Sequence, residues 1–452
     1  MSEDPARPDW AVQLRRDATA FFHAGVAAAE PGGAVLRHLR VQDNKLFIRR
    51  ADKKSERSGD WTAVRVLAFG KAAMAMARAA SSVIPKPLFR GPGIAVTNYE
   101  NVAALPGFAV MGAGHPLPDA NGVAAAKAVA ETTELAGQGE LVLVLISGGG
   151  SALLPYPAEG LTLEDKIATT NLLLASGADI GEINAVRKHL SRLKGGGLAR
   201  LAAPADLHAL ILSDVLGDDL STIASGTTVP DPTSFGDARD VLVRRGAWDK
   251  VPAPVRTRIE KGIASKVPET PKPGDPIFDH AEATLVGSNA VSLASVKAAA
   301  EASGYRVVVF SNCLTGEARE AARSLAALAA REKGPVAIIA GGETTVTLKG
   351  KGKGGRNQEM ALAFAVAAEE MKLAVPCVFL SGGTDGRDGP TDAAGGVTDP
   401  GTAARIRAKG PDPKALLDDN DSYRALELAG DLLRTGATGT NVADLQILLI
   451  GG

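Results

Sequence analysis

The sequence predicts an α/β fold of two domains, and three observations support this prediction. Apolar runs that end in glycine alternate with helical patterns, as in VRVLAFG (64–70) followed by a helix over 71–80. A stretch rich in proline and charge, residues 230–282, separates two such series. The length of 452 residues suits two or three domains. We therefore predict a parallel-sheet domain over 1–280 and a smaller α/β domain with a mixed sheet over 281–452.

The composition narrows the class of protein. There are 50 Lys and Arg against 51 Asp and Glu, which disfavours a nucleic-acid-binding surface spread over the whole molecule. Cys313 and Cys377 lie far apart and in no metal-type spacing, which favours a reducing compartment. The N-terminal residues contain no apolar core of signal-peptide type, and no run approaches the roughly 18 apolar residues of a membrane span. We expect a soluble cytoplasmic protein that binds neither nucleic acid nor membrane and is a monomer or homodimer.

The elements of the first domain follow from local patterns in chain order. Residues 9–29 have an amphipathic helical pattern, and residues 43–61 predict a charged hairpin or exposed loop. Further strands are predicted at 64–70, 93–98, 141–146 and 207–214. Helices are predicted at 71–80, near 121–136, after Leu161 and over 182–203, the last interrupted at LKGGG. Residues 230–282 are predicted to be a solvated connection with one or two helices.

The second domain shows the same alternation. Strands are predicted at 305–311, 336–342, 344–348, 377–383 and 445–452. Helices are predicted at 315–332, 357–371 and 420–435. The second domain is therefore expected to be smaller and to have a sheet of mixed direction.

A glycine loop follows the apolar run LVLVLI (141–146). Six unbroken apolar residues predict a strand buried on both faces. The residues that follow are Ser147, Gly148, Gly149, Gly150 and Ser151. Glycines leave backbone N–H groups uncovered where the next helix begins, which suits a phosphate or carboxylate. A tight turn that needs only small residues explains the same pattern equally well.

Two charged residues also follow predicted strands. Lys71 comes directly after Gly70, at the sheet edge where open α/β proteins bind ligands, and its point charge suits phosphate oxygens. The alternative is a solvent-facing lysine at a helix start. Asp214 ends the strand 207–214, where a carboxylate suits Mg²⁺ or accepts a hydroxyl proton. The alternative for Asp214 is helix capping.

The segment NAVRKHLSRLKGGGLAR (184–200) concentrates basic residues before three glycines. A solvated basic face explains most of them. Arg192 and Lys194 are candidates for binding an anionic substrate, because the turn at Lys194 is able to close over it. His189 is a candidate base, although a lone histidine on a helix is more often structural.

Two loops of the second domain combine glycine with charge. Gly350, Gly352 and Gly355 fit GxGxxG by spacing, but the next strand does not end in the acid of a dinucleotide site. A flexible basic loop ending at Arg356 suits polyphosphate better. SGGTDGRDGPTD (381–392) contains Asp385, a candidate Mg²⁺ or hydroxyl ligand, although Asp and Gly are also what surface turns require. The chain has no GxxxxGK[ST], HExxH, paired CxxC or GxSxG motif.

Several long motifs, in this order, resemble the class II glycerate 2-kinase family, whose C-terminal part is the MOFRL domain. They are FGKAA (69–73), GHPLPD (114–119), ISGGGSALLP (146–155), NAVRKHLSRLKGGGLA (184–199), LSDVLGDD (212–219), IASGTTVPDP (223–232), GGETTVTLKGKGKGGRNQE (341–359) and SGGTDGRDGPTDAAGG (381–396). The resemblance implies a Rossmann-like N-terminal domain, a smaller C-terminal domain and a site in the cleft between them. It implies transfer of the γ-phosphoryl group of ATP to D-glycerate, usually giving 2-phosphoglycerate, with a divalent cation. The family's active-site lysine and arginine correspond to Lys71 and Arg356.

The residues and the resemblance together give one hypothesis of phosphoryl transfer, which requires positioning and charge neutralisation. The loop from Ser147 to Ser151 holds phosphate oxygens, while Lys71 and Arg356 stabilise the transferring group. Asp214 holds Mg²⁺ or acts as base, and Asp385 is a further metal candidate. Arg192 or Lys194 binds the glycerate carboxylate. The alternatives are an NAD(P)H-dependent hydroxypyruvate reductase, a name that relatives have carried, and a non-catalytic protein that binds a small anion.

Overall fold

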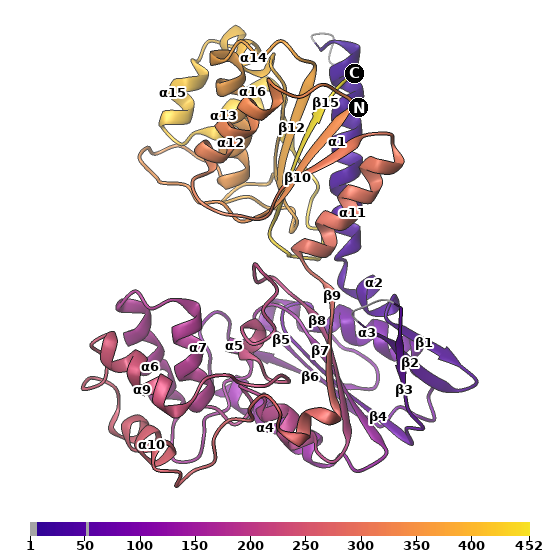
Figure 1. Ribbon diagram of the computed structural model, residues 1–452, viewed down its shortest axis with the longest axis vertical. Coiled ribbons are helices and arrows are strands. Elements are labelled where there is room, and N and C mark those ends of the chain that lie inside the picture. The colour runs from indigo at the N-terminus through magenta and orange to yellow at the C-terminus, as the bar shows by residue number, and fades with distance from the viewer. Residues whose placement is uncertain (1–6, 51–53) are drawn as a thin grey trace. The chain divides into compact units, whose positions relative to one another are not determined.

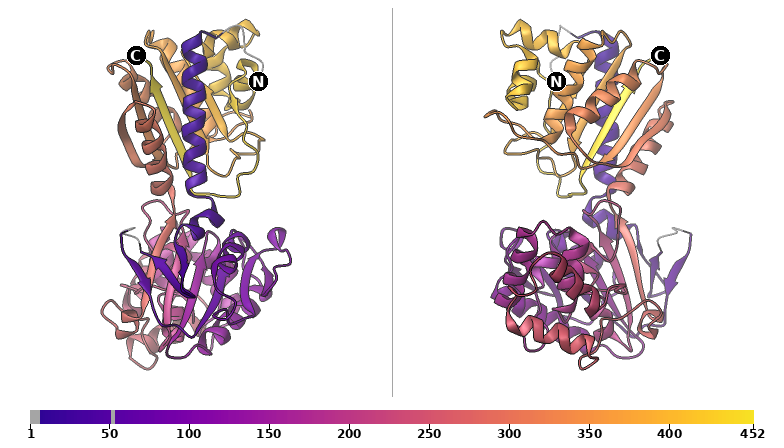
Figure 2. Two further views of the ribbon diagram at one scale, coloured as in Figure 1. Left: turned by 90° about the vertical axis from the view of Figure 1, so that its right-hand side faces the viewer. Right: turned by 60° about the vertical axis from the view of Figure 1, so that its left-hand side comes forward.

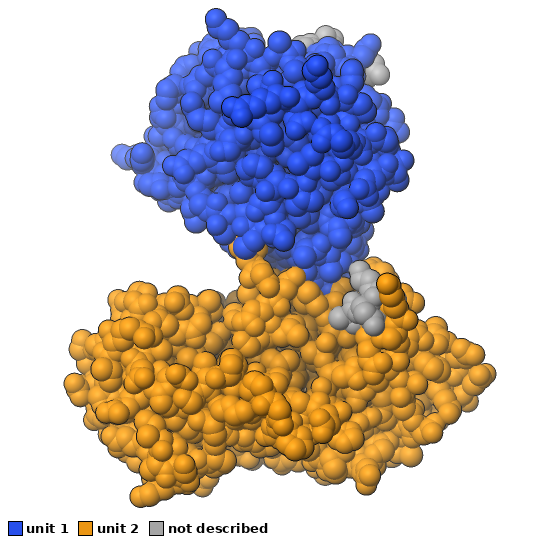
Figure 3. All heavy atoms as spheres, in the orientation of Figure 1, with its two compact units in different colours: residues 1–30, 287–452 blue, residues 31–286 orange. Residues whose placement is uncertain are grey.

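The computed structural model describes residues 7–50 and 54–452, which form two compact units (Figure 3). One unit is Pro31–Val286. The other combines the described residues up to Glu30 with Gly287–Gly452. The predicted boundary at 280 lies a few residues before Gly287, and the N-terminal helix, predicted as part of the first domain, lies in the same unit as Gly287–Gly452. The prediction of two α/β domains, the second smaller, is confirmed.

The sheet of the Pro31–Val286 unit has six strands (Figure 1). Their spatial order is β6 (Phe108–Ala113), β5 (Gly93–Asn98), β4 (Ala63–Phe69), β7 (Glu140–Ile146), β8 (Asp206–Leu212) and β9 (Ala281–Gly287). The pairs from β6 to β8 are all parallel, as predicted. The order reverses between β4 and β7, because the chain first builds outward to β6 and then returns to the other side of β4. In open α/β sheets, ligands bind at the carboxyl ends of strands beside such a reversal.

The predicted strand 141–146 is confirmed as β7, and its apolar residues are buried throughout. Helices α4 (Ala120–Glu134) and α8 (Gly197–Ala202) share one apolar cluster with the sheet. Helix α3 (Ala73–Val83) packs against β4 and β5. Burial of β7 by its neighbours explains why its sequence is continuously apolar rather than alternating.

A group of helices adjoins this sheet: α6 (Leu163–Ala175), α7 (Ile180–His189), α9 (Phe235–Arg244) and α10 (Ala253–Ile263) (Figure 1). Helices α6, α7 and α9 each begin at a capping box, in which two side chains satisfy the first backbone donors. The helices share an apolar cluster that includes Phe235 and Val255. The stretch 230–282 does contain two helices, as predicted, but they pack into this core and are not a solvated connection.

A small antiparallel sheet precedes the main one. It consists of β1 (Leu39–Gln42), β2 (Lys45–Arg49) and β3 (Glu56–Ser58), and it follows the short helix α2 (Pro31–Leu36). The hairpin predicted over 43–61 is therefore confirmed for the described part of that range. Residues 51–53 of the same prediction lie outside the described residues.

The sheet of the other unit is mixed, as predicted. Its order is β10 (Arg306–Leu314), β11 (Val336–Gly342), β15 (Asp444–Ile450), β12 (Cys377–Gly383), β13 (Gly395–Thr398) and β14 (Leu432–Leu433). The pair of β10 and β11 is parallel and the other pairs are antiparallel. The predicted strand 344–348 is wrong. Thr345 makes one isolated bridge to Glu317. The segment then continues into a loop whose backbone is hydrogen-bonded to side chains of residues 419–421.

Helices cover both faces of this mixed sheet. Helices α1 (Asp9–Ala28) and α11 (Asn289–Ala302) pack side by side on one face (Figure 2). Helices α12 (Ala318–Ala329), α13 (Arg356–Glu370) and α16 (Ser422–Ala429) belong to the apolar cluster on the other face. The short helices α14 (Thr402–Ala408) and α15 (Pro413–Asp418) complete this layer.

Helix α1 belongs to this unit because it packs against residues of the segment Gly287–Gly452, which are distant from it in sequence. Phe21 and Phe22 lie in the same apolar cluster as Leu445. Arg15 forms ion pairs with Asp399 at 2.5 Å and with Asp431. An amphipathic pattern predicts that a helix has a buried face but not which part of the chain covers it.

In the part of the chain that the structure describes, no helix is both long and apolar enough to span a lipid bilayer.

Candidate active site

The loops that follow β4 and β7 are tied together where the strand order reverses. The backbone N–H of Ser147 donates to the Phe69 carbonyl at 3.0 Å, and that of Lys71 donates to the Gly148 carbonyl at 2.9 Å. The Ser147 hydroxyl accepts from the Ala72 N–H at 3.0 Å and is buried. The Ser147 side chain therefore fixes the two loops and does not face a ligand, contrary to its predicted role in binding phosphate.

Gly148 and Gly149 are covered by side chains from three other loops. A Cβ at position 148 would overlap the Asp214 carboxylate. A Cβ at position 149 would lie 3.0 Å from the His115 ring and 3.4 Å from Lys71 Cγ, and Gly149 has a φ of +86°. The structure thus brings Lys71, Asp214 and the two glycines together, as the predicted positions at strand ends require. Glycine is needed here because these side chains approach the backbone closely.

His115 is a member of this cluster that the sequence did not single out. It lies in GHPLPD, a motif quoted for the resemblance but given no chemical role. Burial lowers the pKa of His115, and the positive charge of Lys71 lowers it further, against the opposing effects of Asp214 and Glu100. The ring is therefore neutral at pH 7 and able both to donate and to accept a hydrogen bond.

Gly150 and Asp385 have structural surroundings that differ from their predicted roles. A Cβ at Gly150 would meet the Phe69 ring at 2.9 Å, so this glycine allows close packing on the end of β4. Asp385 accepts from the Arg387 backbone N–H at 3.0 Å and so closes its own turn, which agrees with the surface-turn alternative given for it. Among the described residues, no group of three or more His, Cys, Asp or Glu side chains is arranged to hold a metal ion. A single carboxylate such as Asp214 still fits Mg²⁺, which usually binds one or two carboxylates together with substrate phosphates.

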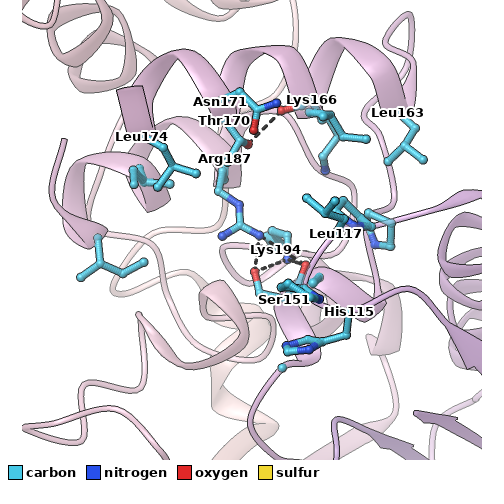
Figure 4. A pocket seen from close by; sticks show the side chains of 18 residues that line it. His115, Leu117, Ser151, Leu163, Lys166, Thr170, Asn171, Leu174, Arg187 and Lys194 are labelled. Atoms are coloured by element: carbon cyan, nitrogen blue, oxygen red, sulfur yellow. Dashed lines mark hydrogen bonds between the residues drawn. The ribbon is translucent and has the colours of Figure 1, made fainter. Parts of the chain in front are cut away.

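A cavity of about 310 Å³ begins at His115 and Gly149 (Figure 4). Its walls are mainly aliphatic and come from α6, α7 and the loop after β6. Three cationic side chains line it: Lys166 from α6, Arg187 from α7 and Lys194 from the turn before α8.

Arg187 and Lys194 both reach Ser151 (Figure 4). Arg187 Nη2 donates to Ser151 Oγ at 2.6 Å, and Lys194 Nζ donates to Ser151 O and Oγ at 2.8 Å each. Lys166 Nζ donates to the Tyr156 carbonyl at 3.4 Å. All of these acceptors are neutral, and in the described chain none of the three cations forms an ion pair. Two buried lysines and a half-buried arginine without a carboxylate form a site that requires an anion.

The electrostatics of the cavity agree with this description. Burial lowers the pKa of Lys166 to about 7, with smaller contributions from Arg187 and Arg258. Burial and the neighbouring cations Arg187 and Lys166 hold the pKa of Lys194 well below its ordinary value. Burial also lowers the pKa of Arg187. A bound anion would favour the charged form of all three groups.

Lys166→Met is expected to stabilise the free protein by about 1–3 kcal/mol at pH 7, because it removes a buried cation that has no carboxylate partner. The folded pKa lies below the unfolded one, so the unfolded lysine keeps a proton that the folded one tends to lose. The gain should therefore be full below pH 7 and disappear as pH rises towards about 10.4. Urea unfolding of the wild type and the variant at pH 7 and pH 10 measures this gain in the free energy of unfolding. A variant less stable than wild type at pH 7 would show that Lys166 is not an uncompensated buried cation.

Of the two predicted substrate-binding residues, the structure places Lys194 in the cavity but not Arg192. The Arg192 guanidinium lies over the Tyr156 ring at 4.7 Å and donates to the Tyr156 hydroxyl at 3.0 Å. The two side chains diverge because the chain leaves helical geometry after α7. Lys166 and Arg187 were not predicted as site residues, because Lys166 stands among the polar residues of α6 and Arg187 among the basic residues of α7, with no local signal of a site.

The other basic residues of this segment are structural. His189 contacts the Ala185 carbonyl at 2.7 Å through Nδ1 and Glu269 at 2.8 Å through Nε2. Lys188 pairs with the buried Asp231 at 3.3 Å. The structural alternative for His189 is confirmed.

Arg356 lies at the start of α13 in the other unit. It binds Asp444 through Nε at 2.6 Å and Nη2 at 3.0 Å, and Glu343 through Nη1 at 2.5 Å. Burial raises the pKa of Asp444, and the hydrogen bonds and charge of Arg356 oppose that rise. The arginine is therefore needed to keep a buried carboxylate ionised.

Arg356→Met is expected to destabilise the protein by about 2–4 kcal/mol, because it leaves the Asp444 carboxylate buried without its cation. Urea unfolding of the full chain measures this cost. The double variant Arg356→Met with Asp444→Asn should recover at least half of it, since the uncompensated charge is gone. A stable double variant that lacks activity would support the predicted role of Arg356 in catalysis, whereas wild-type stability of the single variant would contradict the structural role.

The basic loop before Arg356 is held in place, contrary to the prediction of a flexible polyphosphate loop. Four backbone N–H groups within residues 349–353 donate to side-chain oxygens of Asp419, Asn420 and Asp421, at 2.8–3.1 Å. These donors are consequently not available to cradle a phosphate or a dinucleotide pyrophosphate. The same contacts explain why residues 344–348 lead into a fixed loop and not into a paired strand.

Comparisons with known proteins agree with this architecture. A family described as a domain of unknown function, DUF4147, matches residues 17–260, and the MOFRL family matches residues 336–444. The chain is 40% identical to a glycerate 2-kinase of Pyrococcus horikoshii, over 97% of this chain and 98% of that relative. It is 42% identical to a D-glycerate 2-kinase of Thermotoga maritima, over 90% and 95% of the two chains.

Two further similarities bear on the function. A putative hydroxypyruvate reductase of Agrobacterium vitis is 40% identical, over 97% of this chain and 95% of that relative. The crystal structure of a glycerate kinase from Thermotoga maritima superimposes with a TM-score of 0.85 at 39% identity, covering 97% of this chain and 100% of that one.

Proposed function

We propose a function from the premise that this chain belongs to the class II glycerate kinase family. The enzyme transfers the γ-phosphoryl group of ATP to the 2-hydroxyl of D-glycerate, giving 2-phosphoglycerate and ADP. The observation that carries the proposal is the convergence of Lys71, His115 and Asp214 over Gly148 and Gly149, beside a cavity with three uncompensated cations.

Phosphoryl transfer depends on placing the reacting oxygens and neutralising their charge. Lys71 is exposed at the end of β4, where its ammonium group is able to bind oxygens of the transferring phosphoryl group. Asp214 accepts the proton of the glycerate hydroxyl or holds a divalent cation. His115, neutral at pH 7, is able to donate a hydrogen bond to an oxygen of the transferring phosphoryl group.

Mg²⁺ is part of the proposal because ATP-dependent kinases bind their phosphates together with a divalent cation. Asp214 is the residue of this site that would hold it, with phosphate oxygens as further ligands. When bound, the cation neutralises charge that develops on the phosphate oxygens. Arg356 is kept in the proposal as a second phosphate-binding cation, because its motif resembles that of the family's active-site arginine.

Product identification tests the proposed reaction. Incubation with ATP, Mg²⁺ and D-glycerate should give ADP and 2-phosphoglycerate, distinguished from 3-phosphoglycerate by the carbon that shows coupling to phosphorus in NMR. The matched assay supplies NADH and hydroxypyruvate. Oxidation of NADH without phosphorylation of glycerate would overturn the proposal in favour of the reductase.

A further inference from the structure

The three-cation cavity combines two properties that a three-carbon acid does not require together. Its cations, Lys166, Arg187 and Lys194, converge on one region and have no acidic partner among the described residues. Its remaining walls are formed by aliphatic side chains: Leu117, Leu163, Ile167, Leu174, Ile180 and Ile183. The ligand should therefore have one highly charged part and one part that is largely apolar.

The charge of the cavity favours a polyanion. A single carboxylate would neutralise one of the three positive charges and leave the others buried. A polyphosphate chain carries several negative charges at neutral pH and offers oxygens to all three side chains. Arg187 supplies a planar fork and the two lysines supply point charges, a combination that suits several phosphate oxygens.

The size and surface of the cavity also favour a larger ligand. Its volume of about 310 Å³ is at the lower end of pockets that bind drug-sized molecules. Every carbon of glycerate carries oxygen, so an aliphatic wall has nothing of glycerate to bury. Leu117, Leu174 and Ile180 remain 71%, 59% and 57% exposed, and a flat purine ring placed against them would cover apolar surface that is now in water.

We propose that this cavity is the nucleotide site, in which Lys166, Arg187 and Lys194 bind the phosphate chain and the exposed aliphatic side chains contact the base. The inference rests on the proposed function, because a kinase reaction requires a nucleoside triphosphate. The cavity begins at His115 and Gly149, which the cluster of Lys71 and Asp214 adjoins. The terminal phosphate therefore faces Lys71, and the Ser151 region holds phosphate and not the glycerate carboxylate.

Binding of ADP and of tripolyphosphate, each measured by calorimetry on the full chain, separates the two parts of the site. Arg187→Met should weaken both ligands by about 10–100-fold, because each loses a hydrogen-bonded charge. Leu174→Asn should weaken ADP by about threefold or more and leave tripolyphosphate unchanged. Lys166→Met, which is expected to fold at least as stably as wild type, repeats the charge test if Arg187→Met is poorly folded.

Matched controls are available on α4. Lys127 is 63% exposed in an ion pair with Glu131 at 3.6 Å, so Lys127→Met is the control for the cation variants. Leu135, which follows α4 and is 70% exposed, provides Leu135→Asn as the control for Leu174→Asn. Both control variants should bind ADP with wild-type affinity.

Kinetics distinguishes this inference from the proposed function. Arg187→Met and Lys166→Met should raise KM for ATP by at least tenfold and change KM for D-glycerate by less than threefold. A raised KM for D-glycerate with a nearly unchanged KM for ATP would overturn the nucleotide assignment and leave the kinase proposal in place. Unchanged ADP binding in both cation variants would do the same. Loss of ADP binding in these variants, together with no phosphorylation of glycerate by the wild type, would support the nucleotide site and reject the proposed substrate.

Discussion

Replacing Lys71 with methionine is expected to lower kcat by about 10²–10⁴-fold, because the transferring phosphoryl group loses a cation whose charge is most useful in the transition state. Lys71 is exposed, and its side chain makes no hydrogen bond that holds the fold together among the described residues. The free energy of unfolding should therefore change by less than about 0.5 kcal/mol. A coupled assay of ADP release at saturating ATP and D-glycerate measures kcat.

Lys127→Met is the matched control for Lys71→Met, since it removes an exposed lysine from the same unit. It should leave kcat and both KM values unchanged. If Lys71→Met kept a kcat within threefold of wild type, the assignment of Lys71 to the reacting group would be wrong. If the loss appeared only in KM for ATP, Lys71 would bind the ground state of the nucleotide and not stabilise the transition state.

Asp214→Asn is expected to lower kcat by about 10²–10⁴-fold, the usual contribution of a positioned general base. Asparagine has the shape of aspartate, so it keeps the packing over Gly148 while removing the negative charge. ADP release at several concentrations of MgCl₂ and MnCl₂ measures the effect.

The metal titration separates the two roles proposed for Asp214. A carboxylate that holds the cation predicts an apparent metal affinity at least tenfold weaker and partial recovery at high Mn²⁺. A carboxylate that accepts the hydroxyl proton predicts unchanged metal dependence and a kcat that no metal concentration restores. Wild-type kcat in Asp214→Asn would reject both roles.

The strands and helices of the main sheet were predictable because their signals are local. The run 141–146 is apolar throughout since neighbouring strands and helices bury both its faces, and the glycines after it mark the point where Asp214 and His115 approach. Lys71 and Asp214 were predicted as site residues from position alone, because the carboxyl ends of parallel strands share one edge. Their mutual placement over the glycine loop is what the structure shows.

Features that depend on distant contacts were not predictable. Lys166 and Arg187 look like ordinary helical residues until α6, α7 and the turn at Lys194 meet around one cavity. Ser147 looked like a phosphate ligand, but its hydroxyl bonds to a backbone group from another loop. The basic loop 349–353 looked flexible because the side chains that hold it, Asp419 to Asp421, follow some 70 residues later.

The placement of α1 and β15 has a consequence for synthesis on the ribosome. Helix α1 is made before the Pro31–Val286 unit, while β15, the strand between β11 and β12 whose Leu445 packs in the same cluster as Phe21 and Phe22, is made after it. At roughly 5–20 residues per second, about 20–80 s separate the two. The Pro31–Val286 unit has time to fold first, while the apolar face of α1 stays uncovered. Nascent chains should consequently be most prone to aggregation, and most dependent on chaperones, until β15 emerges.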